Sequence, residues 1–594
     1  MNALKTTIAP PSLLFLLFSI LLAAFSVSAQ SIEWQKNYGG SNDDFVSSIQ
    51  QTTDGGYIMV GGSESSDQDI SGNNGGVDYW ILKTDVNGNI EWEQNYGGSG
   101  DDFASSVHQT FDGGYVVAGS SESSDFDVSG NYGWFDYWIL KLDANGNIEW
   151  EQNYGGSDDD YAASVLQSTD SSYIVAGYTS SFDNDVSNIY DWDDFWVLKL
   201  DANGGIEWEQ NYGGTGDETA ASMKPTMDGG YVLAGHSDSQ DFDAPDNNGD
   251  FDFLVLKLDS SGNVEWGQNY GGSWEDEVFS ITQTSDGGYI VGGSSESSDQ
   301  DVSNNYGDYD YWVIKLDANG NLEWEQNFGG SGYDEVYSVL QTQDGGYLVA
   351  GDTESNDNDF SGNYGAYDSW LLKLDANGNI EWKQNYGGTL YDGSSEIIQT
   401  TDGKYLLAGV SESGDIDLTG NKGGFDFWLV KIDTAACTVD VSVQQSNNTL
   451  SADLAGASYQ WVDCDNENAP VSGAVQQSFT PAENGNYAVI ITENSCSSVS
   501  DCYNVNIVSI AETSSFNDLK LFPNPTEGHI KIDLGSRKDF VKIEVQNSIG
   551  QVIAEESHTN TDLIEHEIDE ESGIYFIQLK IDGQNTEIIK VIKK

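Results

Sequence analysis

Residues 41–98 read SNDDFVSSIQQTTDGGYIMVGGSESSDQDISGNNGGVDYWILKTDVNGNIEWEQNYGG, and the chain repeats this unit with few changes. The tryptophan of its IEW motif recurs every 58 residues, with no insertion or deletion between copies. These tryptophans are Trp34, Trp92, Trp150, Trp208, Trp266, Trp324 and Trp382. A fixed period of this length predicts an array of identical supersecondary units.

Each unit reads as four short strands joined by turns. In the second copy, DDFASSVHQT and YVVAGSSES flank the hairpin signal DGG at residues 112–114, and DYWILKLD and IEWEQNYGG flank an Asn-Gly turn at residues 145–146. Seven four-stranded sheets around one axis form a β-propeller, in which closure of the ring protects the strand edges. A linear solenoid is the alternative, but it needs atypical polar capping units at its ends and the sequence shows none. We therefore predict an all-β chain with a seven-bladed β-propeller over residues 30–434.

The phase of the repeat predicts how the ring closes. The chain enters the array at Ile32, on the fourth strand of one unit, and leaves it at Asp433, after the third strand of another. The segment 32–40 is therefore expected to complete the last blade beside Trp428. This closure is similar to that of WD-repeat propellers, although their GH and WD signatures are absent here.

Antiparallel alternation sorts the loops onto two faces of the disc. The DGG and Asn-Gly turns lie on one face, which we call the tight-turn face, and the YGGS and Asp-rich loops lie on the other, the long-loop face. Binding residues usually sit on long loops held by a rigid scaffold. We therefore expect the long-loop face to carry the function.

The N-terminus and the charge restrict where the protein acts. Lys5, an apolar run from Ser12 and small residues before Gln30 predict a signal peptide over residues 1–29, and no later run of about 18 apolar residues exists to span a membrane. The formal net charge is -76 and Arg537 is the single arginine, so phosphate backbones and anionic membranes are repelled and nucleic acid is excluded as a partner. Cations, including metals, and neutral or basic ligands are compatible with this charge.

The chain changes character after the repeats. Residues 435–509 contain YQWVDC and SFTPAENGNYAVIITENSCSSVSDC, and they resemble the immunoglobulin-like sandwich modules of secreted bacterial surface proteins. All four cysteines lie here, which predicts two disulfides in an oxidising compartment and leaves three pairings open. The cysteines are Cys437, Cys464, Cys496 and Cys502. We expect a spacer, with an independent carbohydrate-binding module as the alternative, followed by a linker over residues 510–518.

Residues 519–594 carry three sequence blocks, namely PNPT at 523–526 with Gly528, a turn at Gly550, and GIYF at 573–576 followed by terminal lysines. In these blocks the segment closely resembles the type A C-terminal sorting domain of the type IX secretion system of Gram-negative bacteria, and we expect it to be a second β-sandwich. The resemblance implies transport across the outer membrane by the secretion machinery and removal of the domain by a cell-surface sortase. It further implies attachment to surface polysaccharide or release.

The Asp-rich loop of each unit is a candidate metal site. Read as twelve residues, DQDISGNNGGVD (67–78) places side-chain oxygens at positions 1, 3 and 5, glycine at 6 and a carboxylate at 12, which is the spacing of a calcium loop. The match is partial, because position 12 is Asp rather than Glu and the third to fifth units lack the glycine. Structural calcium is the candidate ion, and the alternative is that these aspartates cap turns by accepting from backbone N–H groups. The candidate ligands are Asp67, Asp69, Ser71, Asp78, Asp125, Asp127, Ser129, Asp136, Asp357, Asp359, Ser361, Asp368, Asp415, Asp417, Thr419 and Asp426.

Two further charges repeat in every unit. One is the acid that opens the first strand, at Asp44 and its equivalents. These acids could form a ring that attracts a cation at one mouth of the channel. We favour the alternative, in which they are turn carboxylates bonded to the YGGS backbone. Lys83 and its equivalents face either Glu91 or Trp92 on the next strand, in an ion pair or a cation–π contact. A sevenfold repeat favours a structural role, because a catalytic lysine is needed once.

Functional residues are expected where the repeat breaks. Five aromatic residues on the long-loop face do so, and exposed rings there can stack on sugars or anchor a protein partner, or else pack on neighbouring loops. They are Trp134, Trp192, Trp274, Tyr333 and Tyr391. The candidates for catalytic residues are His108, His236 and Lys224, and no GxSxG, HExxH or phosphate-loop motif accompanies them.

These features predict an exported binding or adhesion protein that presents the acidic long-loop face to a glycan or a surface protein. A secreted polysaccharide-degrading lyase or glycoside hydrolase is the alternative, and it requires an unrepeated acid, base and cation in one pocket, near His108 or near His236 and Lys224. A structural surface-layer or adhesion protein without a small ligand is the third possibility. The near-identity of the units favours binding over catalysis.

Overall fold

The computed structural model describes residues 31–594 except 188, 190–191, 246, 434–439, 447, 467–468, 472, 494–495, 506–518 and 583. The predicted signal peptide, the predicted linker and Cys437 lie outside the described residues. In the part of the chain that is described, the regular structure is β-strand apart from two short 3-10 helices, Asn358–Phe360 and Cys464–Asn466. The predicted all-β class is therefore confirmed.

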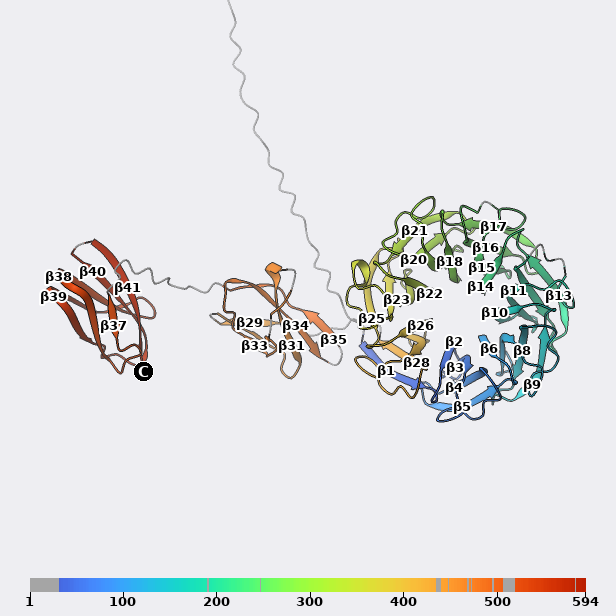
Figure 1. The fold of residues 1–594 in the computed structure, drawn as a ribbon, viewed down its shortest axis with the longest axis horizontal. Coiled ribbons are helices and arrows are strands. Elements are labelled where there is room, and N and C mark those ends of the chain that lie inside the picture. Colours follow the sequence, from blue (N-terminus) through green and yellow to red (C-terminus); the bar gives the residue numbers. More distant parts are fainter. Residues whose placement is uncertain are drawn as a thin grey trace, which may run out of the picture. The chain divides into compact units, whose positions relative to one another are not determined.

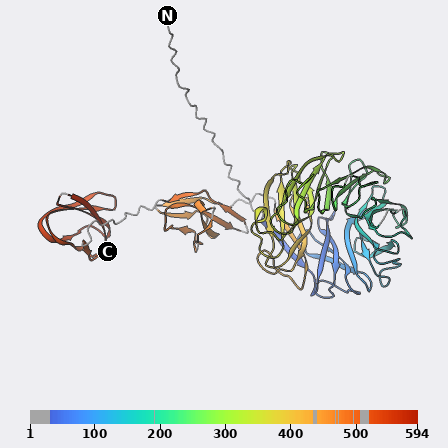
Figure 2. The same cartoon turned by 45° about the horizontal axis from the view of Figure 1, so that its top comes forward.

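Strands β1 to β28 form seven antiparallel sheets of four strands each, arranged as the blades of a ring (Figure 1). Figure 2 shows the same ring turned. The seven-bladed propeller predicted from the 58-residue period is confirmed. The strands, in chain order, are β1 (Ser31–Tyr38), β2 (Asp44–Gln51), β3 (Tyr57–Ser63), β4 (Asp78–Thr84), β5 (Ile90–Tyr96), β6 (Asp102–Gln109), β7 (Tyr115–Ser121), β8 (Asp136–Leu142), β9 (Ile148–Tyr154), β10 (Asp160–Gln167), β11 (Tyr173–Thr179), β12 (Asp194–Leu200), β13 (Ile206–Tyr212), β14 (Glu218–Pro225), β15 (Tyr231–Ser237), β16 (Asp252–Leu258), β17 (Val264–Tyr270), β18 (Asp276–Gln283), β19 (Tyr289–Ser295), β20 (Asp310–Leu316), β21 (Leu322–Phe328), β22 (Asp334–Gln341), β23 (Tyr347–Thr353), β24 (Asp368–Leu374), β25 (Ile380–Tyr386), β26 (Asp392–Gln399), β27 (Tyr405–Ser411) and β28 (Asp426–Asp433).

The two ends of the array share one blade. Strand β1 pairs antiparallel with β28, from Ser31 opposite Asp433 to Tyr38 opposite Phe427, and the sheet order is β1-β28-β27-β26. The ring of Phe427 lies 4.4 Å from that of Trp80 in the first blade. The phase of the repeat predicts this pairing, which ties the start of the propeller to its end by backbone hydrogen bonds.

The two middle strands of each blade are buried on both faces, because neighbouring blades cover them. Strands β3 and β4 are buried along their whole length, whereas the outer strand β5 is partly exposed. Between blades, the Tyr79 ring packs 4.6 Å from that of Trp138, and its hydroxyl donates to the Trp138 carbonyl oxygen at 3.0 Å. A Cβ at Gly119 would lie 2.5 Å from the Tyr79 hydroxyl, so glycine is required for this approach.

The first strand of each blade lies innermost and carries a bulge. In β2 the register shifts between Val46 and Ser48, which leaves Ser47 without a partner in β3. A bulge bends a strand and redirects one side chain. Here the bulged residues line the axial channel, and they are Ser47, Ser105, Ala163, Ala221, Phe279, Tyr337 and Ser395.

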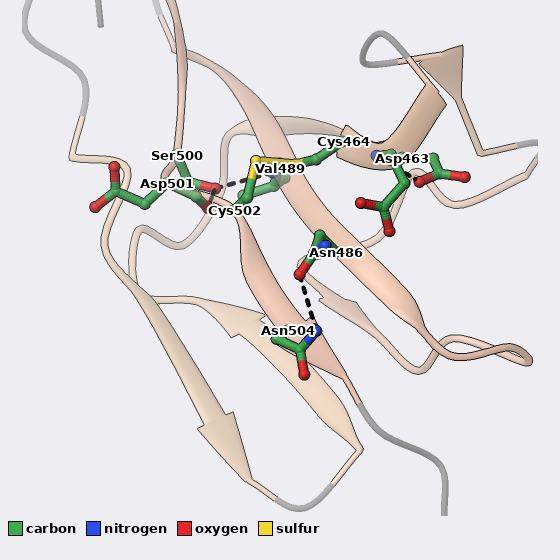
Figure 3. The surroundings of a disulfide bond; sticks show 9 residues. Asp463, Cys464, Asn486, Val489, Ser500, Asp501, Cys502 and Asn504 are labelled. Carbon is green, nitrogen blue, oxygen red and sulfur yellow. Dashed lines mark hydrogen bonds between the residues drawn. A yellow bond between two sulfur atoms is a disulfide. The ribbon is translucent and has the colours of Figure 1, made fainter. Parts of the chain in front are cut away.

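The module after the propeller is a small sandwich of two sheets. One holds β29 (Val443–Ser446), β30 (Thr449–Ala452) and β33 (Ser478–Phe479), and the other holds β31 (Ser458–Asp463), β32 (Ala469–Pro470), β34 (Gly485–Glu493), β35 (Cys496–Val499) and β36 (Tyr503–Val505). Trp461 is fully buried and its ring stacks 5.4 Å from that of Phe479. Cys464 and Cys502 form a disulfide (Figure 3). One of the two predicted disulfides is thus confirmed, and the side chain of Cys496, like Cys437, is outside the described set.

The C-terminal module is a five-stranded antiparallel unit with its own apolar core. It contains β37 (Lys520–Phe522), β38 (His529–Asn547), β39 (Val552–Glu567), β40 (Gly573–Ile581) and β41 (Gln584–Lys593), and β38 pairs with β37, β39 and β40. Its buried residues include Ile532, Ile543 and Leu579. The expected second sandwich-like module therefore follows the first.

Candidate functional site

Aromatic rings gather at the long-loop ends of the first three strands of the blades. We call this set the aromatic girdle, and it comprises Phe45, Phe103, Phe135, Tyr161, Tyr178, Tyr309, Tyr333, Tyr367, Tyr391 and Phe425. Neighbouring members contact one another with ring centroids 5.1 to 6.1 Å apart, and four of the seven pairs cross a blade boundary while three lie within one blade. The rings are only partly buried, so the girdle offers stacking surface at the rim of the channel.

The structure divides the five predicted aromatic residues into two groups. Tyr333 stacks 5.8 Å from Tyr309, and Tyr391 packs 5.2 Å from Tyr367, so both belong to the girdle. The other three lie on loops of the same face with more than half of their surface exposed. These are Trp134 (68%), Trp192 (69%) and Trp274 (60%).

Glutamates of the fifth and sixth blades accept hydrogen bonds from a girdle ring and from a bulged tyrosine of the channel. The Tyr309 hydroxyl donates to Glu275 Oε2 at 2.5 Å, and the Tyr337 hydroxyl donates to Glu335 Oε2 at 2.5 Å. Burial and the charges of Glu335 and Glu275 raise the pKa of Glu277. A proton is therefore held more tightly here than on an exposed glutamate.

Asp352 is a buried acid next to the same rings. It accepts from the Ser394 N–H at 2.5 Å and from the Tyr391 hydroxyl at 3.1 Å. Burial, with a smaller contribution from Glu335, raises its pKa well above the ordinary value. At the Asp352 position the other units carry Gly62, Ser120, Tyr178, His236, Ser294 and Val410. Asp352 is thus the one acid at this position among the seven units. Attention to repeated residues missed it, but the break in the repeat is visible in the sequence.

The Asp-rich loops use their carboxylates to hold turns. Asp67 Oδ1 accepts from the Ser41 N–H at 2.9 Å, and its six equivalents accept from the matching N–H at 2.8 to 3.0 Å. Asp78 Oδ2 accepts from the Asn74 N–H at 2.6 Å, and Ser71 donates to Glu93. Across the described residues, no three His, Cys, Asp or Glu side chains gather in a way that would hold a metal ion. Calcium binding by these loops stays a prediction.

The acid that opens each first strand is buried and has a turn-capping role, as we favoured. Asp44 Oδ2 accepts from the Gly40 N–H at 2.7 Å, and Oδ1 accepts from the Ser63 hydroxyl at 2.5 Å. Asp44 and its equivalents have no exposed surface. They therefore do not line the mouth of the channel.

A pair of acids lies at each junction between blades. A Cβ at Gly271 would lie 2.2 Å from Asp252 Oδ1 and 2.6 Å from Asp276 Oδ2, so the two carboxyl groups crowd the same point. Burial and the charge of Asp276 raise the pKa of Asp252 to about 8. At six junctions an Oδ1 atom is buried without a hydrogen-bond partner among the described residues. These atoms belong to Asp78, Asp136, Asp252, Asp310, Asp368 and Asp426.

The junction of the seventh and first blades differs from the others because it contains a lysine. Lys422 occupies the unit position of Asn74 and pairs with Asp69. Burial raises the pKa of Asp426 to about 6, and the charge of Lys422 opposes this rise. One junction thus has a built-in cation.

The repeated lysine forms an ion-pair network on the tight-turn face. Lys83 Nζ lies 2.7 Å from Glu91 and 3.1 Å from Asp54, and only 3% of its side chain is exposed. Five further blades repeat both contacts, whereas Lys431 in the seventh pairs with Asp402 at 2.9 Å. The ion pair, and with it the structural role, is confirmed.

The candidate catalytic residues are divided between the two faces. His108 and Lys224 line one cavity at the tight-turn mouth of the channel, together with Glu396. His236 lies opposite Thr219 near the long-loop end of β15, with its ring 5.3 Å from that of Phe251, and burial lowers its pKa to about 4. Lys224 pairs with Val232 at the other end of the same strands, so His236 and Lys224 do not form one site.

Residues 520–594 match the family described as the secretion system C-terminal sorting domain. This match confirms the resemblance seen in the sequence blocks and indicates that the protein is secreted or attached to the outer cell surface. No helix in the described part of the chain is long and apolar enough to cross a membrane.

The propeller has more distant similarities. Regulatory protein FlaEY of Caulobacter vibrioides is 27% identical over 233 residues, which is 36% of this chain and 24% of that protein. The chain therefore spans about a quarter of the length of this relative. A variant of the Synechocystis apocarotenoid oxygenase shares 12% identity at a TM-score of 0.33, covering 68% of this chain and 94% of its own. A DUF4221 family member from Bacteroides vulgatus shares 10% identity at a TM-score of 0.29, covering 68% and 99%. Similarities at this level carry no functional argument.

Proposed function

We propose that the protein is a glycan-binding protein of the cell surface, which recognises sugar through the aromatic girdle. The observation that carries the proposal is the run of partly exposed, mutually packed rings at the rim of the channel, centred on Tyr333 and Tyr391. Aromatic faces pack against the C–H faces of sugars, and carboxylates beside them accept from sugar hydroxyls. The sorting domain supports this proposal, because it delivers the propeller to the outside of the cell.

The rings are held in place before any ligand arrives. Tyr391 is fixed by its hydrogen bond to Asp352, and Tyr309 by its bond to Glu275. Fixed rings lose little side-chain entropy on binding, so their contact area contributes more of its energy to affinity. The propeller scaffold supplies this rigidity.

A glycan array on the purified mature protein, followed by calorimetry with the best ligands, tests the proposal. Tyr333→Ala and Tyr391→Ala should each weaken binding by up to about tenfold, the loss expected for one stacking contact of about 0.5–1.5 kcal/mol. Tyr132→Ala is the matched control, since Tyr132 is exposed on a long loop outside the girdle. Array silence, or equal binding by all three variants, would contradict the proposal.

A polysaccharide-degrading activity is the second candidate, and Glu277 is the observation in its favour. Its raised pKa beside Glu335 and Glu275 is the arrangement that an acid catalyst uses. Incubation with the glycans found on the array, followed by assays for reducing ends and for unsaturated uronates, tests this activity. Glu277→Gln should abolish any activity, whereas Glu354→Gln should not.

A further inference from the structure

The tight-turn mouth of the channel differs from the rest of its face, because residues that break the repeat line it. A cavity of about 300 Å³ opens there, and His108, Lys224 and Glu396 contribute to its wall. At the position of Glu396 the six other units carry serine. Lys224 and His108 occupy one equivalent position, and the five other units carry Gln50, Leu166, Thr282, Leu340 and Ile398 there.

Lys224 is an unusual cation in this chain. The propeller has twelve lysines between residues 31 and 433, and ten of them form an ion pair with a carboxylate. Among the twelve lysines of the propeller, all of them described, only Lys224 and Lys36 form none. The whole chain has 98 acidic and 22 basic residues, so carboxylate partners are abundant. Lys224 is half-buried, lines the cavity and has no carboxylate partner. Its ammonium group is therefore available to an anionic ligand.

Glu396 lies on the other side of the ring. It belongs to β26 in the seventh blade, and Lys224 to β14 in the fourth (Figure 1). Its carboxylate accepts from the Ser48 hydroxyl at 3.0 Å and from the Ile49 N–H at 2.8 Å. In three other blades a serine makes this contact to the next blade, as Ser106 does with the Val165 N–H at 3.1 Å. Glu396 therefore keeps the wall intact and adds one negative charge to it.

His108 adds a polar group without adding charge at neutral pH. Burial and the charge of Lys224 lower the pKa of His108, so its imidazole is neutral there and both donates and accepts a hydrogen bond. The amide side chain of Gln50 lines the same wall. The cavity thus combines one cation, one fixed anion and several neutral hydrogen-bonding groups.

We propose that this mouth binds a small hydroxylated carboxylate of the sugar-acid class, with Lys224 pairing with the carboxylate and Glu396 and His108 bonding its hydroxyl groups. The ligand carries one negative charge, because Glu396 and the acidic surroundings repel a second. A cavity of this size lies at the lower end of the range for small-molecule sites, which suits a single sugar ring. The site lies on the face opposite the aromatic girdle and does not depend on the function proposed there.

The hairpin turns that follow the strands of His108 and Lys224 carry exposed apolar side chains. Phe111 and Met227 lie three residues beyond His108 and Lys224, and they are 67% and 70% exposed. The other units carry polar residues at this loop position, which are Thr53, Thr169, Ser285, Gln343 and Thr401. The same two blades therefore supply polar groups to the mouth and exposed apolar side chains to the tight-turn face.

Calorimetry on the full mature chain tests the proposal with two probes of equal size, D-glucuronate and D-glucose. Glucuronate should bind at least about tenfold more tightly, because glucose lacks the carboxylate. Lys224→Thr should remove this preference, and threonine is tolerated at the position since the fifth unit carries Thr282 there. Lys36→Thr is the matched control at the other lysine that lacks an ion pair, and it should bind as the unmodified protein does.

Thermal unfolding of each variant shows whether the fold is retained. If Lys224→Thr unfolds, Lys224→Leu replaces it, since the sixth unit carries Leu340 at this position. Equal affinity for the two probes, no binding of either, or undiminished glucuronate binding by the Lys224 variant overturns the proposal. Tighter binding of D-glucosamine than of glucuronate also overturns it, because Glu396 would then be the recognition group.

Discussion

The two faces of the propeller use aspartate in opposite ways. On the tight-turn face Asp228 lies 3.0 Å from the Lys257 ammonium, and hydrogen bonds and this charge lower its pKa to about 2. On the long-loop face of the same blade Asp252 is buried beside Asp276 and its pKa is raised to about 8. The first face stabilises the charged carboxylate, and the second stabilises the protonated one. Within this blade the chain thus pairs an acid with a lysine on one face and favours the protonated form of an acid on the other.

The largest expected effect of this difference is on pH-dependent stability. The junction carboxyls have folded pKa values of about 6 to 8, above their unfolded values near 4, so the folded state binds more protons. Their contribution to the stability of the folded state is fully present below about pH 4 and is lost as pH rises through 6 to 8. The melting temperature should therefore fall between pH 5 and pH 8 in thermal unfolding at constant ionic strength.

The tight-turn carboxylates change stability with pH in the opposite direction. Asp170, Asp228 and Asp402 have pKa values of about 2, so their contribution is present above about pH 4 and is lost only as pH falls through 2. Stability should therefore decline again in strong acid. A melting temperature that rises steadily from pH 5 to pH 8 would show that the junction acids are not protonated in the folded state.

Calcium is the next effect in size, and it would act on the long-loop face alone. If the Asp-rich loops bind calcium as their spacing predicts, a concentration 100-fold above Kd should stabilise the protein by about 2.7 kcal/mol for each site. Thermal unfolding at pH 8 with calcium, with magnesium and with a chelator measures this effect. If calcium neither raises the melting temperature nor gives a calorimetric binding signal, the prediction is wrong.

A matched pair of substitutions within one blade separates the two faces. Asp252→Asn replaces a carboxyl oxygen without a partner by an amide N–H2 that donates to Asp276, and it should stabilise the protein by about 1–3 kcal/mol at pH 8 and by less at pH 5. Asp228→Asn removes a partly exposed ion pair and should destabilise by about 0.2–1 kcal/mol at pH 8. Denaturant unfolding at the two pH values measures both. Changes of the same sign would break the comparison between the faces.

The smallest effect is expected at the junction that contains its own cation. Lys422→Met removes the partner of Asp69 and should cost about 0.2–1 kcal/mol at pH 8, because both groups are partly exposed. Asn74→Lys, the converse change at the first junction, should stabilise the protein at pH 8 but not at pH 5. If Asn74→Lys destabilises at pH 8, the junctions do not attract a cation.

Comparison of the units predicted most of the fold. The spacing of Trp34 and its equivalents gave the number of blades, and the offset between Ile32 and Asp433 gave the pairing of β1 with β28. The ion pair of Lys83 with Glu91 was one of two predicted alternatives, because Glu91 lies on the adjacent strand of the same hairpin. Each of these contacts is local in sequence or fixed by the period.

The candidate site was predicted less completely. Tyr333 and Tyr391 were found because they break the repeat, but Tyr309 and Tyr367, on which they pack, belong to the blades that precede them. Glu396 was missed because acids are abundant in the chain and its meaning depends on a cavity. The Asp252 and Asp276 pair was missed because its members come from different blades.

By itself, the sequence determined a closed all-β propeller, its two kinds of face and its export signal at residues 519–594, since these depend on periodicity, turn chemistry and a linear motif. Only the tertiary structure decided which acids are charged. Asp228 lies in a DGG turn and Asp252 closes an Asp-rich loop, and these sequence contexts do not by themselves predict which of the two is protonated. Hydrogen bonds from Thr226 and Gly230 and the charge of Lys257 lower the pKa of Asp228. Burial and the charge of Asp276 raise that of Asp252, and this neighbour is set by the packing of one blade against the next.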